Sequence, residues 1–178
     1  MKVTKLMMAA SGLLASPAVW AHPGHDTTAS FAHGFMHPLT GADHLLALLL
    51  IGMFAAPYGW KTASKAIGVV LGALAMGFVA GIEWVNTSHI ETVVMASLVL
   101  LPLALIAMRR SALQALALAA VALFSACHGI VQGAESQGAL LQYALGTLLA
   151  SGVVIVASLL VSKAVRRAVL ATRQFSRR

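Results

Sequence analysis

The sequence predicts an all-α membrane protein, a helical bundle of about five transmembrane helices with a broken first segment, preceded by a cleavable signal peptide. Composition, the spacing of apolar stretches and the placement of basic residues lead to this prediction. Of the 178 residues, 60% are hydrophobic and 10% are charged, and the mean hydropathy is +0.88. Soluble globular chains are about 45–50% apolar and about 25% charged. This chain therefore has too little polar surface to face water on all sides.

Residues 1–21 have the pattern of a secretory signal peptide. Lys2 and Lys5 give it a basic start, a short and mostly apolar run follows, and small residues stand at the positions that signal peptidase recognises before Ala21. An uncleaved first span is the alternative, but the apolar run is short and is interrupted by serine, glycine and proline. We predict cleavage after Ala21, so that the mature chain begins at His22, outside the cytoplasm.

Five long apolar stretches follow the signal peptide and predict the membrane-spanning helices. The first stretch is short for a span, but the segment 30–36 before it is also largely apolar, and Pro38 and Gly41 interrupt the pair. This pattern predicts a short helix, a break and then the span proper. Broken helices at membrane depth commonly mark binding sites. The five stretches cover roughly residues 42–56, 66–82, 90–108, 113–132 and 139–161.

The basic residues all fall on one side of the predicted bundle. With an external N-terminus and five spans, every Lys and Arg beyond the signal peptide lies on one side, and the other side receives none. The positive-inside rule then places the N-terminus outside and the C-terminus in the cytoplasm, in a bacterial cytoplasmic (inner) membrane. This placement explains the pI of about 10.4 without a nucleic-acid partner, and the basic tail is expected to lie at an anionic inner leaflet.

Histidines and acidic residues gather toward the predicted external side. All seven histidines lie beyond the signal peptide, and none falls near a cytoplasmic loop of this topology. Imidazole and carboxylate ligands suit nickel, cobalt, zinc or iron, and ionisable groups within a membrane are functional candidates by default. The candidate metal ligands are His22, His25, His33, His37, Asp43, His44, Glu91, His128, Gln132 and Glu135.

The densest group of candidates lies in residues 33–44. His33 and His37 are four residues apart and share a face if the segment is helical, and Asp43 and His44 fall in the first turn of the following span. A structural alternative explains Asp43 alone, because Thr40 as N-cap with Asp43 three residues on resembles a capping box. It does not explain the histidines, so we expect this segment to handle a metal ion.

A second group lies at the external end of the fourth span. His128, Gln132 and Glu135 fall on one helical face. A lone buried histidine is more often a packing residue, but the alignment of the three favours a ligand set. Glu91, beside His89 at the start of the third span, could complete the site; alternatively, these two are solvated loop residues.

A third group lies at the predicted mature N-terminus. There His22 offers an α-amine and an imidazole as a chelating pair, with His25 nearby. A flexible, solvated tail is the alternative.

Other features are expected to be structural. Cys127, the single cysteine, lies in an apolar run, so a disulfide within one chain is excluded and a small buried residue is expected. Gly68 and Gly72, and likewise Gly77 and Gly81, are spaced for close helix packing.

The candidate residues resemble the patterns of a known family. Residues 37–44, His-Pro-Leu-Thr-Gly-Ala-Asp-His, are similar to the HPxxGxDH signature of the HupE/UreJ family of nickel and cobalt permeases, and residues 124–135 resemble its second signature. Glu91 and Ser97 resemble a further pattern of the family. Where many members have a second histidine, this chain has Gln132. The resemblance covers essentially the whole mature chain. It implies secondary uptake of nickel or cobalt, often to supply hydrogenase or urease.

We therefore expect a transmembrane transport domain over 22–162, between the signal peptide 1–21 and a basic cytoplasmic tail 163–178. The expected function is ATP-independent uptake, with Ni²⁺ or Co²⁺ as transported substrate and no tightly bound cofactor. We expect no enzyme activity, and the sequence has no Walker-type loop. Expected partners are the metal ion and membrane lipid, with a homo-oligomer as a further option. The alternatives are a membrane-bound metalloenzyme, for which no separate nucleophile or base is evident, and a metal-sensing accessory subunit.

Overall fold

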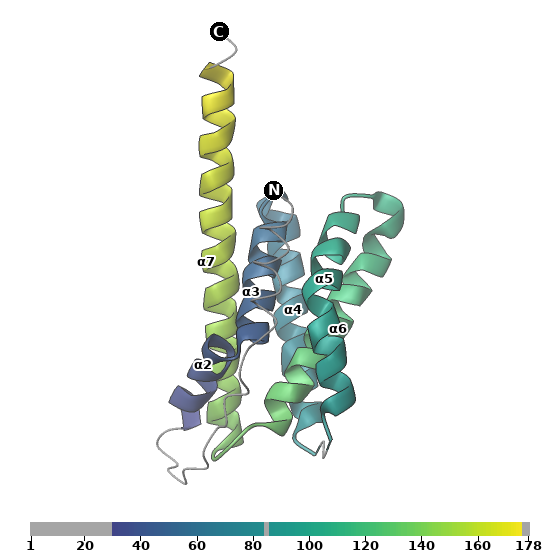
Figure 1. The fold of residues 1–178 in the computed structure, drawn as a ribbon, viewed down its shortest axis with the longest axis vertical. Coiled ribbons are helices and arrows are strands. Elements are labelled where there is room, and N and C mark those ends of the chain that lie inside the picture. Colours follow the sequence, from purple (N-terminus) through teal and green to yellow (C-terminus); the bar gives the residue numbers. More distant parts are fainter. Residues whose placement is uncertain (1–29, 84–85, 176–178) are drawn as a thin grey trace, which may run out of the picture.

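The computed structural model describes residues 30–83 and 86–175, and all the regular secondary structure within this part is helical (Figure 1). The all-α prediction is therefore confirmed. The predicted signal peptide, with its cleavage site, and the ligand candidates His22 and His25 lie outside the described residues. The helices are α2 (Ser30–Thr40), α3 (Ala42–Ala55), α4 (Trp60–Gly81), α5 (Ser88–Ala107), the 3-10 helix η2 (Ser111–Leu113), α6 (Gln114–Ala134) and α7 (Leu140–Phe175).

Four of these segments are long and apolar enough to cross a membrane, namely α4, α5, η2 with α6, and α7. The pair α2 and α3 makes a fifth if it is counted as one broken span, bent by 74° at the break. Pro38 lies inside α2, and Gly41 separates the two helices. The chain is thus a multi-pass membrane protein, and the predicted break in its first segment is confirmed.

The start of α3 differs from the capping box considered above. Gly41 is the N-cap, with an extended backbone (φ −75°, ψ 110°), and no side chain caps the helix. Thr40 instead ends α2, where its hydroxyl lies 3.1 Å from the carbonyl oxygen of Met36 and 3.2 Å from that of His37. The capping interpretation of Asp43 is therefore wrong, because Gly41 rather than Thr40 is the N-cap and no side chain makes a capping hydrogen bond.

Helices α4 and α6 pack closely through glycines. A Cβ atom on Gly77 or Gly81 would collide with the backbone of α6, and one on Gly129 or Gly133 would collide with the backbone of α4. The predicted packing role of Gly77 and Gly81 is confirmed, as expected for small residues spaced four apart. The same prediction is wrong for Gly68 and Gly72, because a Cβ atom at either position would meet no atom within 4 Å.

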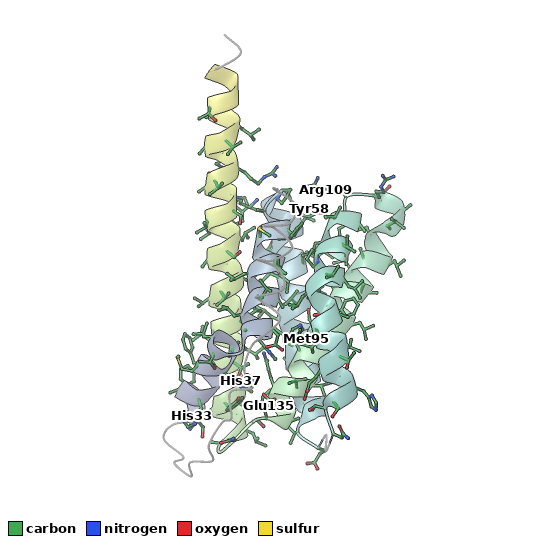
Figure 2. The ribbon with its side chains drawn as sticks, in the orientation of Figure 1. His33, His37, Tyr58, Met95, Arg109 and Glu135 are labelled. Carbon is green, nitrogen blue, oxygen red and sulfur yellow. The ribbon has the colours of Figure 1, made fainter. Side chains whose placement is uncertain are left out.

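The helices alternate in direction, so the chain has two chemically different ends (Figures 1 and 2). We call one the histidine end; it holds α2 and the α4–α5 and α6–α7 connections, with His33, His37 and Glu135 labelled at the bottom of Figure 2. The other, the basic end, holds the α3–α4 connection, η2 and the later turns of α7. Its described basic residues are Lys61, Lys65, Arg109, Arg110, Lys163, Arg166 and Arg167.

An apolar core fills the bundle toward the basic end. Its most buried members include Val70 of α4, Leu101 and Leu105 of α5, Val121 of α6 and Ile155 of α7, each with no exposed surface. Polar buried side chains are concentrated closer to the histidine end. The polar and apolar parts of the interior are thus separated along the bundle axis.

Candidate metal path

Three histidines from three helices form a continuous file, which we call the imidazole file. The ring of His37 (α2) lies 5.4 Å from that of His44 (α3), and the ring of His44 lies 5.0 Å from that of His128 (α6), measured between centroids. The His37 side chain is 20% exposed, whereas that of His44 is 5% exposed and His128 is 4% exposed. The file therefore runs from the surface into the interior.

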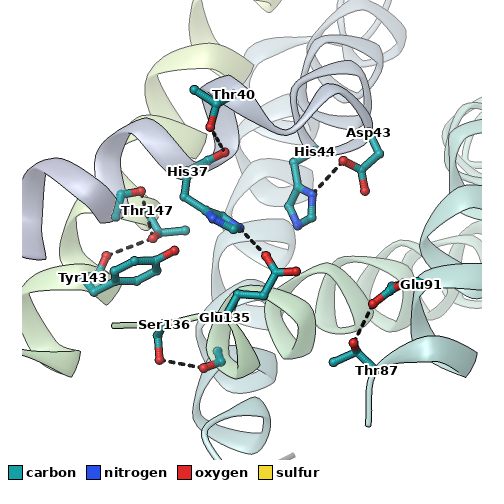
Figure 3. A network of polar contacts seen from close by, with 12 residues as sticks. His37, Thr40, Asp43, His44, Thr87, Glu91, Glu135, Ser136, Tyr143 and Thr147 are labelled. Atoms are coloured by element: carbon teal, nitrogen blue, oxygen red, sulfur yellow. Dashed lines mark hydrogen bonds and ion pairs between the residues drawn. The ribbon is translucent and has the colours of Figure 1, made fainter. Parts of the chain in front are cut away.

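The outer end of the file is next to a carboxylate. Nε2 of His37 lies 3.4 Å from Oε2 of Glu135, which follows the last residue of α6 and has a half-exposed side chain (Figure 3). This separation is within ion-pair range, but His37 Nε2 makes no hydrogen bond. The ring of Tyr143 lies 5.8 Å from the ring of His37 and closes its other side. A cation from outside would thus meet an oxygen and a nitrogen ligand together.

The position of His37 depends on how α2 sits on α7. Gly34 touches the backbone of Tyr143, and Gly146 touches the backbone of Phe31, so the two helices approach as closely as their main chains allow. The Thr147 hydroxyl lies 3.0 Å from the carbonyl oxygen of Gly34 and 2.9 Å from that of Tyr143 (Figure 3). The position of α2 on α7 is therefore fixed by close helix packing and by the buried hydroxyl of Thr147.

The second histidine is oriented by its sequence neighbour. Nδ1 of His44 lies 3.1 Å from Oδ1 of Asp43 (Figure 3). A carboxylate accepts a proton donor, so the Nδ1–H of His44 donates to Asp43 and leaves the lone pair on Nε2. That Nε2 atom is buried and has no hydrogen-bond partner. Histidines that bind metals commonly donate their second nitrogen to a carboxylate in this way.

The third histidine is oriented by a serine of α5. The Ser97 hydroxyl donates to the carbonyl oxygen of Val94 at 2.6 Å and also lies 2.8 Å from Nε2 of His128. A hydroxyl has one proton, so with that proton on Val94 it accepts the Nε2–H of His128. In the neutral imidazole the lone pair is then on Nδ1, as a metal ligand requires.

The file ends at a small cavity between α3, α4 and α6. Its volume is about 10 Å³, close to the smallest space that admits one water-sized particle. His44, Ser125, His128 and Gln132 supply its polar lining, and the rest is apolar. Gln132 is 2% exposed, and the Ser125 hydroxyl is buried without a hydrogen-bond partner. A polar particle here would meet nitrogen and oxygen atoms on one side and hydrocarbon on the other.

The other predicted ligands lie apart from the file. His33 is exposed, one turn before His37 on α2. Glu91 is exposed in the first turn of α5 and accepts a hydrogen bond of 2.6 Å from Thr87. Within residues 30–83 and 86–175, no group of three or more His, Cys, Asp and Glu side chains is arranged to hold a metal ion together. In this conformation the candidates form a series of positions.

Sequence reasoning missed two polar side chains beside the file. Ser125 lies one helical turn before His128 and lines the cavity, while Tyr143 flanks His37. Each stands among apolar residues, and a buried polar group within a membrane helix is the signal that points to such residues. Cys127, expected to be a small buried residue, is partly buried and lines no part of the cavity.

Comparison with known proteins identifies the family. The chain matches the family described as HupE / UreJ protein over residues 8–176. It is also similar to Protein HupE of Rhizobium leguminosarum bv. viciae, with 30% identity over 94 residues, which cover 53% of this chain and 49% of that protein. The match thus spans about half the length of that curated relative. No solved structure matches the chain. Because the family match extends over nearly the whole sequence, the chain belongs to the HupE/UreJ family.

Proposed function

We propose that the chain takes up a divalent transition-metal ion, nickel or cobalt, across the cytoplasmic membrane by ATP-independent secondary transport. Membership of the HupE/UreJ family, whose members are associated with nickel and cobalt transport, supports metal uptake in general. The observation that carries the proposal is the imidazole file, in which His37, His44 and His128 follow one another from the surface to a buried cavity. Imidazole suits nickel and cobalt as a ligand.

Capture takes place at the histidine end. Glu135 and His37 present an oxygen and a nitrogen 3.4 Å apart, and Glu135 is open to solvent. Glu91 is near enough for its charge to act on Glu135, so the two carboxylates make this end attractive to a cation. In the mature protein, His22 and His25 serve as first ligands, and His33 extends the same surface along α2.

The ion then passes along the file. Nε2 of His44 is without a hydrogen-bond partner, and the bond from His128 to Ser97 leaves the lone pair of His128 on Nδ1. The Gln132 amide and Ser125 hydroxyl line the same cavity. Together, the carboxylates of Asp43 and Glu135 compensate the double charge of the cation. The ligands replace its water shell stepwise, because no group of His, Cys, Asp and Glu among the described residues offers a complete coordination sphere.

Release occurs at the basic end, which we expect to face the cytoplasm by the positive-inside rule. The cavity is closed toward that end by apolar side chains, including Ile51, Val70 and Leu74. Transport therefore requires these helices to separate after the ion has bound. The chain works as a permease without a nucleotide-driven step.

The test is uptake of ⁶³Ni²⁺ or ⁵⁷Co²⁺ into proteoliposomes that contain only the purified full-length protein. We expect uptake without ATP, and we expect His44→Gln to abolish it because the buried lone pair of His44 is lost. His89→Gln is the matched control, since His89 is an exposed histidine of the same end. Wild-type uptake by His44→Gln would show that the file does not carry the ion. A purified protein that binds metal but transports none would support the accessory-subunit alternative.

A further inference from the structure

The basic end contains a second cavity, and we propose that it binds the phosphate group of an anionic membrane lipid. The cavity has a volume of about 280 Å³ and lies between the α3–α4 connection and α7. Lys163, Arg166 and Arg167 of α7 form its basic wall, while Pro57, Tyr58 and Leu170 are among the residues that complete it. It is separated from the imidazole file by the apolar core.

Lys163 and its contacts hold the walls of the cavity together. Its ammonium group donates to the carbonyl oxygen of Ala56 at 3.0 Å and to that of Tyr58 at 2.6 Å, and lies 4.9 Å from the centre of the Trp60 ring. The Tyr58 hydroxyl in turn donates to the carbonyl oxygen of Leu105. The α3–α4 connection is thus fastened to both α7 and α5, so the cavity is formed before any ligand binds.

Among the residues that the structure describes, the positive charge of this cavity has no acidic counterpart nearby. Every described Asp and Glu lies at the histidine end, in the first turns of α3 and α5 or just after α4 and α6. Arg166 and Arg167 are exposed, and each guanidinium offers five N–H donors in the geometry that suits phosphate. Such a group of uncompensated donors favours an anion with several oxygen atoms.

The surroundings favour a lipid over a soluble phosphate compound. Trp60 is exposed beside the cavity at the start of α4, and with Tyr58 it marks the level of the membrane interface, where these side chains concentrate. On the membrane side of the basic wall, Val156 is 40% exposed and Leu160 is 49% exposed, so apolar surface continues from the arginines along α7 toward the bilayer. A lipid satisfies both features, with its phosphate on the arginines and its acyl chains on the apolar surface.

The test is native mass spectrometry of the purified full-length protein with an equimolar mixture of phosphatidylglycerol and phosphatidylcholine. We expect preferential retention of phosphatidylglycerol. The variant Arg166→Gln/Arg167→Gln should weaken this retention by about tenfold or more. The matched control, Lys61→Gln/Lys65→Gln, removes the same charge at the same end from residues that do not line the cavity, and should bind like the wild type.

Three results would overturn the proposal. Equal weakening in both double variants would mean that binding reflects the general charge of this end. Equal retention of the two lipids would mean that the cavity does not select an anion. Displacement of the lipid by inorganic phosphate at similar concentration would identify free phosphate as the occupant. All the measurements are made without metal, so they are independent of transport.

Discussion

At the level of single residues, Asp43 acts through its neighbour. Its carboxylate holds Nδ1 of His44 at 3.1 Å and so directs the free lone pair of Nε2 into the interior. Ser97 does the same for His128 from a different helix. Two of the three file histidines thus have a fixed orientation before an ion arrives, which lowers the entropic cost of binding.

We expect Asp43→Asn to give a folded, membrane-inserted protein whose metal uptake falls by about 10–100-fold, the range for loss of an outer-shell partner of a metal-binding histidine. The amide oxygen can still accept the proton of His44, but the negative charge is lost. The measurement is initial uptake at equal protein abundance. Thr40→Ala is the control, because the Thr40 hydroxyl bonds only within α2; normal uptake by Asp43→Asn would show that its charge has no role.

Ser97→Ala removes the acceptor for Nε2–H of His128. We expect Co²⁺ affinity, followed by visible absorption of the bound ion, to fall by about 10–100-fold. We also expect stability to fall by about 1–3 kcal/mol, because a buried donor loses its partner. Ser151→Ala is the control, since Ser151 is a buried serine without a hydrogen-bond partner. Unchanged affinity in Ser97→Ala would mean that His128 does not need this bond to bind metal.

At the level of elements, the α2–α7 pair sets the outer end of the file. α2 has only 11 residues and includes Pro38, so it is too short to cross a membrane by itself. It depends on the close approach of Gly34 and Gly146 to the opposite main chains and on the Thr147 hydroxyl. Any change that lifts α2 from α7 also moves His37 away from His44.

Gly34→Ala therefore tests whether the close contact between α2 and α7 stabilises the protein. The added methyl group would collide with the backbone of Tyr143, so we expect a loss of about 1–3 kcal/mol in unfolding free energy, as for other overpacked sites. Unfolding in mixed detergent micelles, followed by circular dichroism, is the measurement. Gly68→Ala is the matched control: nothing lies within 4 Å of its Cβ position, and alanine favours a helix. Similar destabilisation by both changes would mean that the contact at Gly34 is unimportant.

The sequence predicted the helices better than it predicted their partners. The apolar stretches, together with Pro38 and Gly41, indicated both the spans and the break, because each depends on local composition. Contacts between residues 34 and 147 depend on how two distant helices pack, and no local pattern contains that information. The capping interpretation was wrong for a related reason. The Thr40 hydroxyl could accept from the start of α3 as an N-cap or donate to the end of α2, and only the second contact is formed, with Gly41 as the N-cap.

At the level of the whole molecule, the described basic residues and histidines lie at opposite ends of the bundle. The sequence predicted this separation from a count of spans, and the alternating helices confirm that the described basic residues share one end. A count of spans could not predict which histidines contact one another. The contact between His44 and His128 requires α6 to be turned toward α3, and the Gly129–Gly133 contact with α4 fixes that rotation.

The orientation in the membrane can be tested directly. A reporter that is active only outside the cytoplasm should work when fused after His89 or Glu135, because both lie at the histidine end. It should fail when fused after Lys61 or Arg110 of the basic end. A cytoplasm-specific reporter at the same positions provides the control and should give the reverse pattern. External activity at Lys61 would reverse the direction of the proposed transport.

The position of the cavity along α6 has an electrical consequence. Gln114–Ala134 measures about 31 Å as a helix, and His128 lies about 9 Å from its end at the histidine side. About two-thirds of the membrane voltage therefore falls between the cavity and the basic end, across apolar side chains. A divalent cation that follows the proposed path gains about 3 kcal/mol per 100 mV between the cavity and the basic end. It gains about half as much between the histidine end and the cavity. Metal binding at the file should thus respond weakly to voltage, while release into the cytoplasm should respond strongly.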